Sequence, residues 1–167
     1  MNSFPILKKP SHLLATLFGI GLLPLAPGTW GSLAALIAYL YVVIYLSLSS
    51  EIIILLTASI VIVSIIVCHL ATRQLSKKDK DQKSIVIDEL AGLWIAFLPL
   101  TGLIMVREIL LYSVVAFFLF RLFDIWKPYP ISLIDEKMKS GFGVVLDDLV
   151  AGIYAAIFTC LFLFLFS

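Results

Sequence analysis

The spacing of charged residues is the feature that most restricts how this chain can fold. Five stretches carry no charged side chain: residues 10–50, 52–72, 90–106, 109–120 and 149–167. About 18 or more apolar residues without charge are typical of a membrane-spanning helix, because about 20 residues cross the ~30 Å hydrocarbon layer. The hydrophobic content of 62% exceeds the roughly 45–50% of soluble domains. We therefore predict a membrane protein, and the net charge of +1 offers no basic surface for nucleic acid.

The uncharged runs predict a single all-α domain over residues 1–167, a polytopic membrane bundle of about six helices with roughly five spanning. Residues 12–23 are too few to span and predict a short re-entrant or interfacial helix, ended by Pro24 and Pro27. Residues 131–140 predict a short amphipathic helix. The spans are expected at 28–48, 52–70, 88–106 with a kink at Pro99, 109–126, and 147–167.

Positive residues predict the orientation of this bundle, because Lys and Arg are enriched in cytoplasmic loops. With the N-terminus inside, eleven of the 12 basic residues lie on the inner side, and only Arg107 lies outside. The apolar stretch after Lys8 and Lys9 has no cleavage-like pattern, so we expect it to be retained.

Acidic residues gather at the inner ends of the predicted spans. Ionisable groups at this depth are costly and tend to mark function. We therefore expect three helices to bring carboxylates together at the inner boundary of the membrane. These acids are Asp88, Glu89, Asp124, Asp147 and Asp148.

Two of the predicted spans begin with the same pattern, D-x-x-A-G, at 88–92 and 148–152. On a helix the small residues lie one turn beyond the aspartate, on the same face, and small residues permit close helix approach in lipid. We expect Asp88 and Asp148 to face a seam between helices. The alternative is that both are ordinary first-turn acids favoured by the helix dipole.

Two basic residues and a hydroxyl-rich segment could bind an anion near these acids. Arg121 and Lys127 suit phosphate or carboxylate, although Lys127 could instead extend its charge into water and Asp124 could be only the partner of Arg121. Thr29 and Ser32 lie where a helix is expected to begin, a position that favours anions.

Clustered carboxylates without His or Cys nearby favour Mg²⁺ over Zn²⁺. Mg²⁺ beside phosphate-binding cations is typical of phosphoryl transfer. The sequence has no G-x-x-x-x-G-K-[ST] loop for a nucleotide.

Four segments resemble the phosphatidylglycerophosphatase A family, in the family's order. They are PLAPGTWGSLAAL (24–36), IDELAGLWIAFLPL (87–100), FRLFDIWKPYPI (120–131) and GFGVVLDDLVAGIYAA (141–156). The resemblance implies a Mg²⁺-dependent phosphatase of phospholipid synthesis that converts phosphatidylglycerophosphate to phosphatidylglycerol and phosphate. It also implies an all-helical fold around a central helix.

The resemblance and the residue pattern together give a mechanistic hypothesis. Mg²⁺ is held by Asp88, Asp124 and Asp148, with Glu89 or Asp147 assisting. Arg121 and Lys127 bind the phosphate, and Thr29 and Ser32 position it. The nucleophile is either a water activated by the metal or a carboxylate. The site is expected on the cytoplasmic side of a bacterial-type inner membrane, facing a phospholipid of the inner leaflet.

Three other functions remain open from the sequence. Acids at one depth could line the path of a divalent-cation transporter or belong to a structural membrane subunit, but the outer halves of the spans carry few polar groups. A head-group transferase is a third possibility, but the chain lacks the expected D-G-x-x-A-R pattern.

Overall fold

The computed structural model describes residues 4–73, 75, 82–138 and 140–166, and all regular elements within these ranges are helical. This confirms the predicted all-α class. The basic residues expected in the inner loop at 77–80, and Lys139, lie outside the described residues. The elements are α1 (Pro10–Ala15), η1 (Ile20–Leu22), α2 (Pro27–Leu40), η2 (Tyr41–Tyr45), α3 (Ser50–Thr72), α4 (Ile87–Ala96), η3 (Leu98–Gly102), α5 (Val106–Trp126), α6 (Ile131–Lys137) and α7 (Gly141–Phe166).

Four helices in the described ranges are long and apolar enough to cross a membrane: α2 with its π-helical end η2, α3, α5 and α7. The third predicted span, 88–106, is wrong in length. Helix α4 has only 10 residues and gives way to the 3₁₀ segment η3, which contains Pro99. Proline lacks the N–H that a continuing helix needs and disfavours helical geometry in the residue before it.

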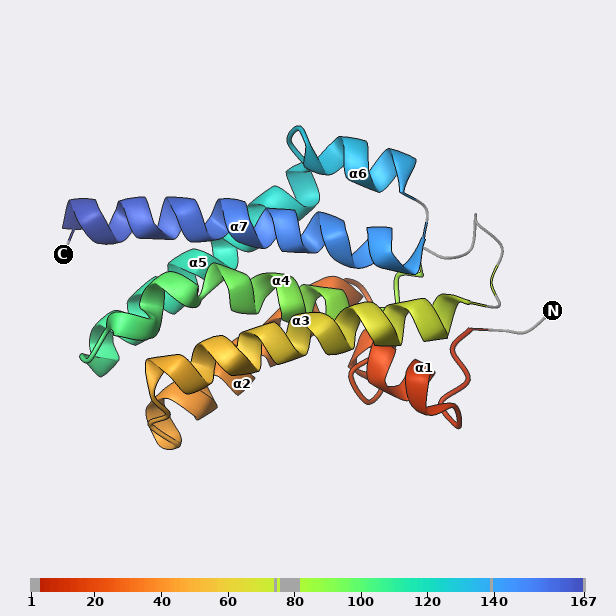
Figure 1. The fold of residues 1–167 in the computed structure, drawn as a ribbon, viewed down its shortest axis with the longest axis horizontal. Coiled ribbons are helices and arrows are strands. Elements are labelled where there is room, and N and C mark those ends of the chain that lie inside the picture. Colours follow the sequence, from red (N-terminus) through yellow and green to blue (C-terminus); the bar gives the residue numbers. More distant parts are fainter. Residues whose placement is uncertain (1–3, 74, 76–81, 139, 167) are drawn as a thin grey trace.

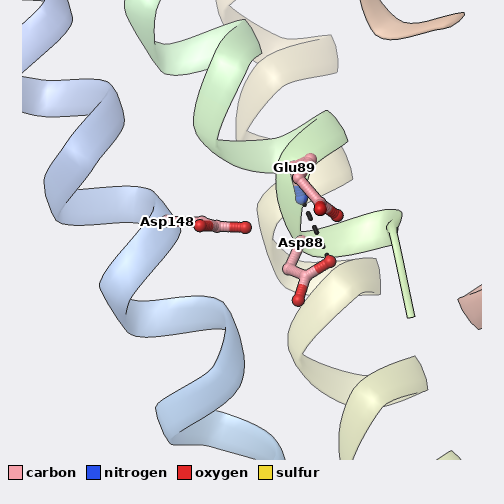
Figure 2. Close-up of side chains that lie close together, drawn as sticks. All are labelled: Asp88, Glu89 and Asp148. Carbon is pink, nitrogen blue, oxygen red and sulfur yellow. Dashed lines mark hydrogen bonds between the residues drawn. The ribbon is translucent and has the colours of Figure 1, made fainter. Parts of the chain in front are cut away.

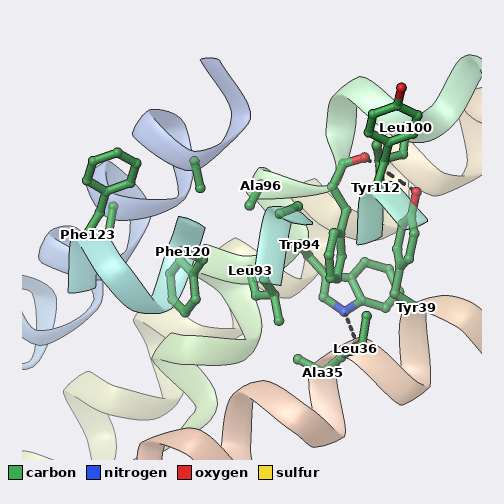
Figure 3. Close-up of a cluster of buried hydrophobic side chains, with 14 of the residues drawn as sticks. Ala35, Leu36, Tyr39, Leu93, Trp94, Ala96, Leu100, Tyr112, Phe120 and Phe123 are labelled. Carbon is green, nitrogen blue, oxygen red and sulfur yellow. Dashed lines mark hydrogen bonds between the residues drawn. The ribbon is translucent and has the colours of Figure 1, made fainter. Parts of the chain in front are cut away.

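Helix α4 lies at the centre of the bundle, between α3 and α7 in Figure 1, and also packs against α2 and α5. Its side chains Leu93 and Trp94 lie in the main hydrophobic cluster (Figure 3). The Trp94 indole donates a hydrogen bond to the Ala35 carbonyl at 3.2 Å, and the Tyr39 hydroxyl donates to the Phe97 carbonyl at 3.4 Å. These bonds satisfy polar groups where lipid offers no partner, so a helix too short to span is held by its neighbours.

The two D-x-x-A-G segments meet where α4 and α7 cross. A Cβ on Gly92 would lie 2.5 Å from the Asp148 carbonyl oxygen, and a Cβ on Gly152 would collide with the Gly92 carbonyl. The predicted seam is confirmed, and Ala91 and Ala151 are fully buried beside it. Because the glycines bring the two backbones into contact, the aspartates one turn earlier lie side by side.

Helix α7 begins at Gly141, so the prediction that Asp147 opens this span is wrong. Glycines commonly end helices, and those at 141 and 143 follow the short helix predicted at 131–140. Instead they allow close packing: a Cβ on Gly141 would lie 2.7 Å from the Cys68 carbonyl of α3, and one on Gly143 would collide with the Met138 carbonyl. The acids of α7 therefore lie in its second turn.

We expect Gly152→Val to lower the stability of the protein by about 1–3 kcal/mol, the usual cost of overpacking a close contact. The added side chain must separate α7 from the Gly92 carbonyl. The melting temperature in detergent measures this effect. Gly102→Val is the matched control, since a Cβ there meets no atom within 4 Å. Equal melting temperatures for the two variants would contradict the seam.

Candidate active site

Three carboxylates from two helices form the centre of the site (Figure 2). Asp88 and Glu89 lie in the first turn of α4, and Asp148 points toward them from α7. Ligand oxygens of the three lie within 4.8 Å of one another, and Asp88 and Asp148 are only 6% and 5% exposed. The Glu89 backbone N–H donates to Asp88 Oδ1 at 3.1 Å. Buried carboxylates this close together require a compensating positive charge.

Arg121 of α5 joins the start of α2 to this centre. Its Nη1 lies 2.6 Å from Asp124 Oδ2 and 3.4 Å from Ser32 Oγ, and its Nη2 lies 3.5 Å from Thr29 Oγ1. The three residues predicted at one end of a phosphate site are thus brought together. Asp124 forms an ion pair with Arg121, which is the role that the sequence left open for Asp124 as an alternative to metal binding.

Gly28 allows this approach because the first turn of α2 lies directly against the site. A Cβ on Gly28 would collide with the Glu89 carboxylate and lie 3.3 Å from Arg121 Nη1. Glu89 Oε2 and Arg121 Nε are buried and have no hydrogen-bond partner among the described residues. Polar atoms buried in this way are costly, and they indicate that the site is shaped for a polar ligand.

Lys127 lies directly after α5 in a left-handed conformation (φ 47°) and has different partners from Arg121. Its Nζ lies 2.7 Å from Asp147 Oδ2 and 3.1 Å from Asp135 Oδ1. Burial alone would lower the pKa of Lys127, but the hydrogen bonds and charges of Asp147 and Asp135 outweigh it and raise the pKa above its usual value. Lys127 therefore stays protonated, and it is paired rather than simply extended into water.

Asp135 of α6 is a site residue that the sequence did not reveal. It is separated from Lys127 by the turn containing Pro128 and Pro130 and has no helical spacing to it. The available signal was weak: an acid on a short amphipathic helix that follows the basic end of α5.

One cavity of about 120 Å³ lies beside these groups, and the described residues that line it do not include Thr29, Ser32 or Arg121. All five predicted metal ligands line it, together with Lys127 and Asp135. The five differ in their partners, because Asp124 is paired with Arg121 and Asp147 with Lys127. The residues around the cavity are Gln82, Lys83, Ile85, Asp88, Glu89, Asp124, Lys127, Asp135, Met138, Gly143, Val144, Asp147 and Asp148.

The donor set fits a hard cation. The grouped oxygens belong to carboxylates, as Mg²⁺ prefers, and the cavity lining includes no Cys or His among the described residues. Glu89 Oε2 and Asp147 Oδ1 are buried oxygens that find no partner in the part of the chain that the structure describes, and an ion could satisfy them. Asp88, Glu89 and Asp148 are the residues placed to hold it.

Comparison with known proteins also indicates a site that acts on phosphate. Residues 13–163 match the family described as phosphatidylglycerophosphatase A. The chain is 41% identical to the Haemophilus influenzae protein named phosphatidylglycerophosphatase A, over 90% of this chain and 87% of that one. It is 34% identical to the Escherichia coli protein of the same name, over 90% and 81%. A Bacteroides thetaiotaomicron protein provisionally named phosphatidylinositol-3-phosphatase is 36% identical, over 90% and 94%.

No solved structure matches the chain. The family match covers nearly the whole sequence and includes all the residues that line the cavity. The chain belongs to the phosphatidylglycerophosphatase A family.

Proposed function

We propose that this protein is a membrane phosphatase, folded as one domain, that hydrolyses phosphatidylglycerophosphate to phosphatidylglycerol and inorganic phosphate. Family membership supports the reaction. The observation that carries the proposal is a cavity lined by the clustered carboxylates and by Lys127, next to Arg121, which is paired with the lining residue Asp124. Carboxylates can hold a cation that faces the phosphate, and Arg and Lys can bind its remaining oxygens.

Asp88, Glu89 and Asp148 are proposed to hold Mg²⁺, with Asp124 and Asp147 completing the acidic lining. The bound ion would neutralise the carboxylates and stabilise negative charge on the phosphoryl group. Arg121 is held by Asp124 and by the hydroxyls of α2, so its guanidinium is oriented before the substrate arrives. Either a water attacks phosphorus directly, or a carboxylate of the cluster attacks it and a water then hydrolyses the resulting acyl phosphate to release inorganic phosphate. In both cases the bond to the glycerol oxygen breaks and that oxygen takes a proton.

The site is proposed to lie at the lipid head-group level on the cytoplasmic side of a bacterial-type inner membrane. Arg121 and Lys127 lie at the site end of α5, and Arg107 lies at its other end, which agrees with the enrichment of basic residues in cytoplasmic loops. Exposed apolar side chains cover the faces of the long helices, among them Phe118, Leu122 and Ile157. The acyl chains of an inner-leaflet substrate can lie against such faces while the phosphate enters the cavity.

Phosphate release tests this function directly. The purified protein in detergent is expected to release phosphate from short-chain phosphatidylglycerophosphate when Mg²⁺ is present. EDTA is expected to stop the release and added Mg²⁺ to restore it. The clustered carboxylates of Asp88, Glu89 and Asp148 repel phosphate unless a cation is bound. Phosphatidylinositol 3-phosphate is the comparison substrate, given the name of one relative. Faster release from that lipid would contradict the proposed substrate, and release unchanged by EDTA would contradict the metal.

A further inference from the structure

Arg121 and Lys127 are two cations near the clustered carboxylates, and they are held by different elements. Arg121 is fixed by Asp124 and the start of α2. Lys127 is fixed by Asp135 of α6 and Asp147 of α7. Six residues along a helix correspond to a rise of about 9 Å, so the two cations need not contact the same phosphate.

The proposed substrate also carries two phosphates with different chemistry. The terminal phosphomonoester is removed, and the phosphodiester stays attached to the lipid. A three-carbon glycerol bridge separates them. A guanidinium binds two oxygens at once, which suits a phosphomonoester, whereas an ammonium is a point charge that can bind a single diester oxygen.

The surroundings of Lys127 leave it able to bind such an oxygen. An ammonium has three donors, and within the described part of the chain the carboxylates of Asp135 and Asp147 account for two of them. The side chain lines the cavity and is 30% exposed, whereas that of Arg121 is 14% exposed. The more open cation is therefore the one placed to meet the part of the head group that remains joined to the lipid.

We propose that Lys127 binds the phosphodiester of the substrate while Arg121 binds the phosphomonoester, so that Lys127 determines specificity for lipids carrying both groups. Asp135 is a positioning residue that acts through Lys127. This inference rests on the proposed function.

Inhibition by the two products separates these roles. Phosphatidylglycerol carries only the diester, and inorganic phosphate resembles only the group that is removed. In Lys127→Met we expect kcat/KM for phosphatidylglycerophosphate to fall about 10- to 100-fold, the size of one charge-assisted hydrogen bond. The inhibition constant of short-chain phosphatidylglycerol should rise by a similar factor, and that of phosphate should stay unchanged.

Three further variants complete the test. Lys127→Arg should keep inhibition by phosphatidylglycerol, because it keeps the positive charge. Asp135→Asn should raise KM and the inhibition constant of phosphatidylglycerol while leaving that of phosphate unchanged. Lys137→Met, which removes a charge from the exposed end of α6, should change neither constant. Melting temperatures in detergent identify any variant that fails to fold, and Lys127→Arg then gives the informative comparison with the wild type.

A rise of both inhibition constants by the same factor in Lys127→Met would overturn the division of roles, as would no change in either. A loss of phosphatidylglycerol inhibition in Lys127→Arg equal to that in Lys127→Met would also overturn it. A wild-type protein that releases no phosphate from phosphatidylglycerophosphate would contradict the proposed function itself.

Discussion

Phosphate release is expected to fall by roughly 10²- to 10³-fold when Asp148 is replaced by Asn, the loss typical of removing one electrostatic contact in an active site. Asn keeps the shape of the side chain but removes the negative charge from a group whose oxygens lie within 4.8 Å of one another. Asp88→Asn is expected to have an effect of the same size. The initial rate of phosphate release from short-chain phosphatidylglycerophosphate at saturating Mg²⁺ measures both.

Stability separates a loss of chemistry from a loss of folding in these variants. Removing one of several buried like charges relieves repulsion, so the melting temperature in detergent without metal should stay the same or rise. Glu136→Gln is the matched control, since it removes one negative charge from an exposed position on α6. Full activity in either aspartate variant at normal protein yield would remove that residue from the site.

Arg121→Gln is expected to abolish most activity and also to destabilise the fold by about 1–3 kcal/mol, because it leaves the partly buried Asp124 carboxylate without its partner. Arg121 is the ion-pair partner of Asp124 at 2.6 Å and reaches Ser32 and Thr29 on α2. Its loss therefore weakens both the phosphate site and the contact between α5 and α2. The kinetic effect is measured by kcat/KM, and the structural effect by thermal unfolding in detergent.

The double variant Arg121→Gln with Asp124→Asn distinguishes these two effects. With the unpaired charge removed, most of the lost stability should return while activity stays low. Recovery of activity together with stability would show that Arg121 serves only to neutralise Asp124, which would exclude it as a phosphate ligand.

The seam between α4 and α7, and the proximity of Asp88 and Asp148 across it, could be predicted because both depend on local patterns. Small residues one turn beyond an aspartate place that aspartate at a helix contact whatever the rest of the chain does. The structure accordingly brings Asp88 and Asp148 together across Gly92 and Gly152.

Features that depend on tertiary contacts were predicted less well. The uncharged run at 90–106 has the composition of a span, yet Pro99 and burial on all sides make α4 a short central helix. The glycines at 141 and 143 indicate a helix end by propensity, but their packing against α3 and Met138 places them inside α7. The pairing of Asp135 with Lys127 depends on how the chain turns between α5 and α6, which no helical spacing encodes.

The length of α7 has a consequence for the membrane in which the protein works. From Asp148 to Phe166 the helix rises about 27 Å at ~1.5 Å per residue, close to the ~30 Å thickness of the hydrocarbon layer. The side chains at its far end, Phe164, Leu165 and Phe166, are exposed and apolar, and in Figure 1 this end lies farthest from α1 and α6. With the site at the proposed head-group level, the length of α7 would set how deep in the membrane the carboxylates lie. In a thicker or thinner bilayer, hydrophobic mismatch would tilt or shift α7 and move the carboxylates out of the plane of the phosphates that they must meet.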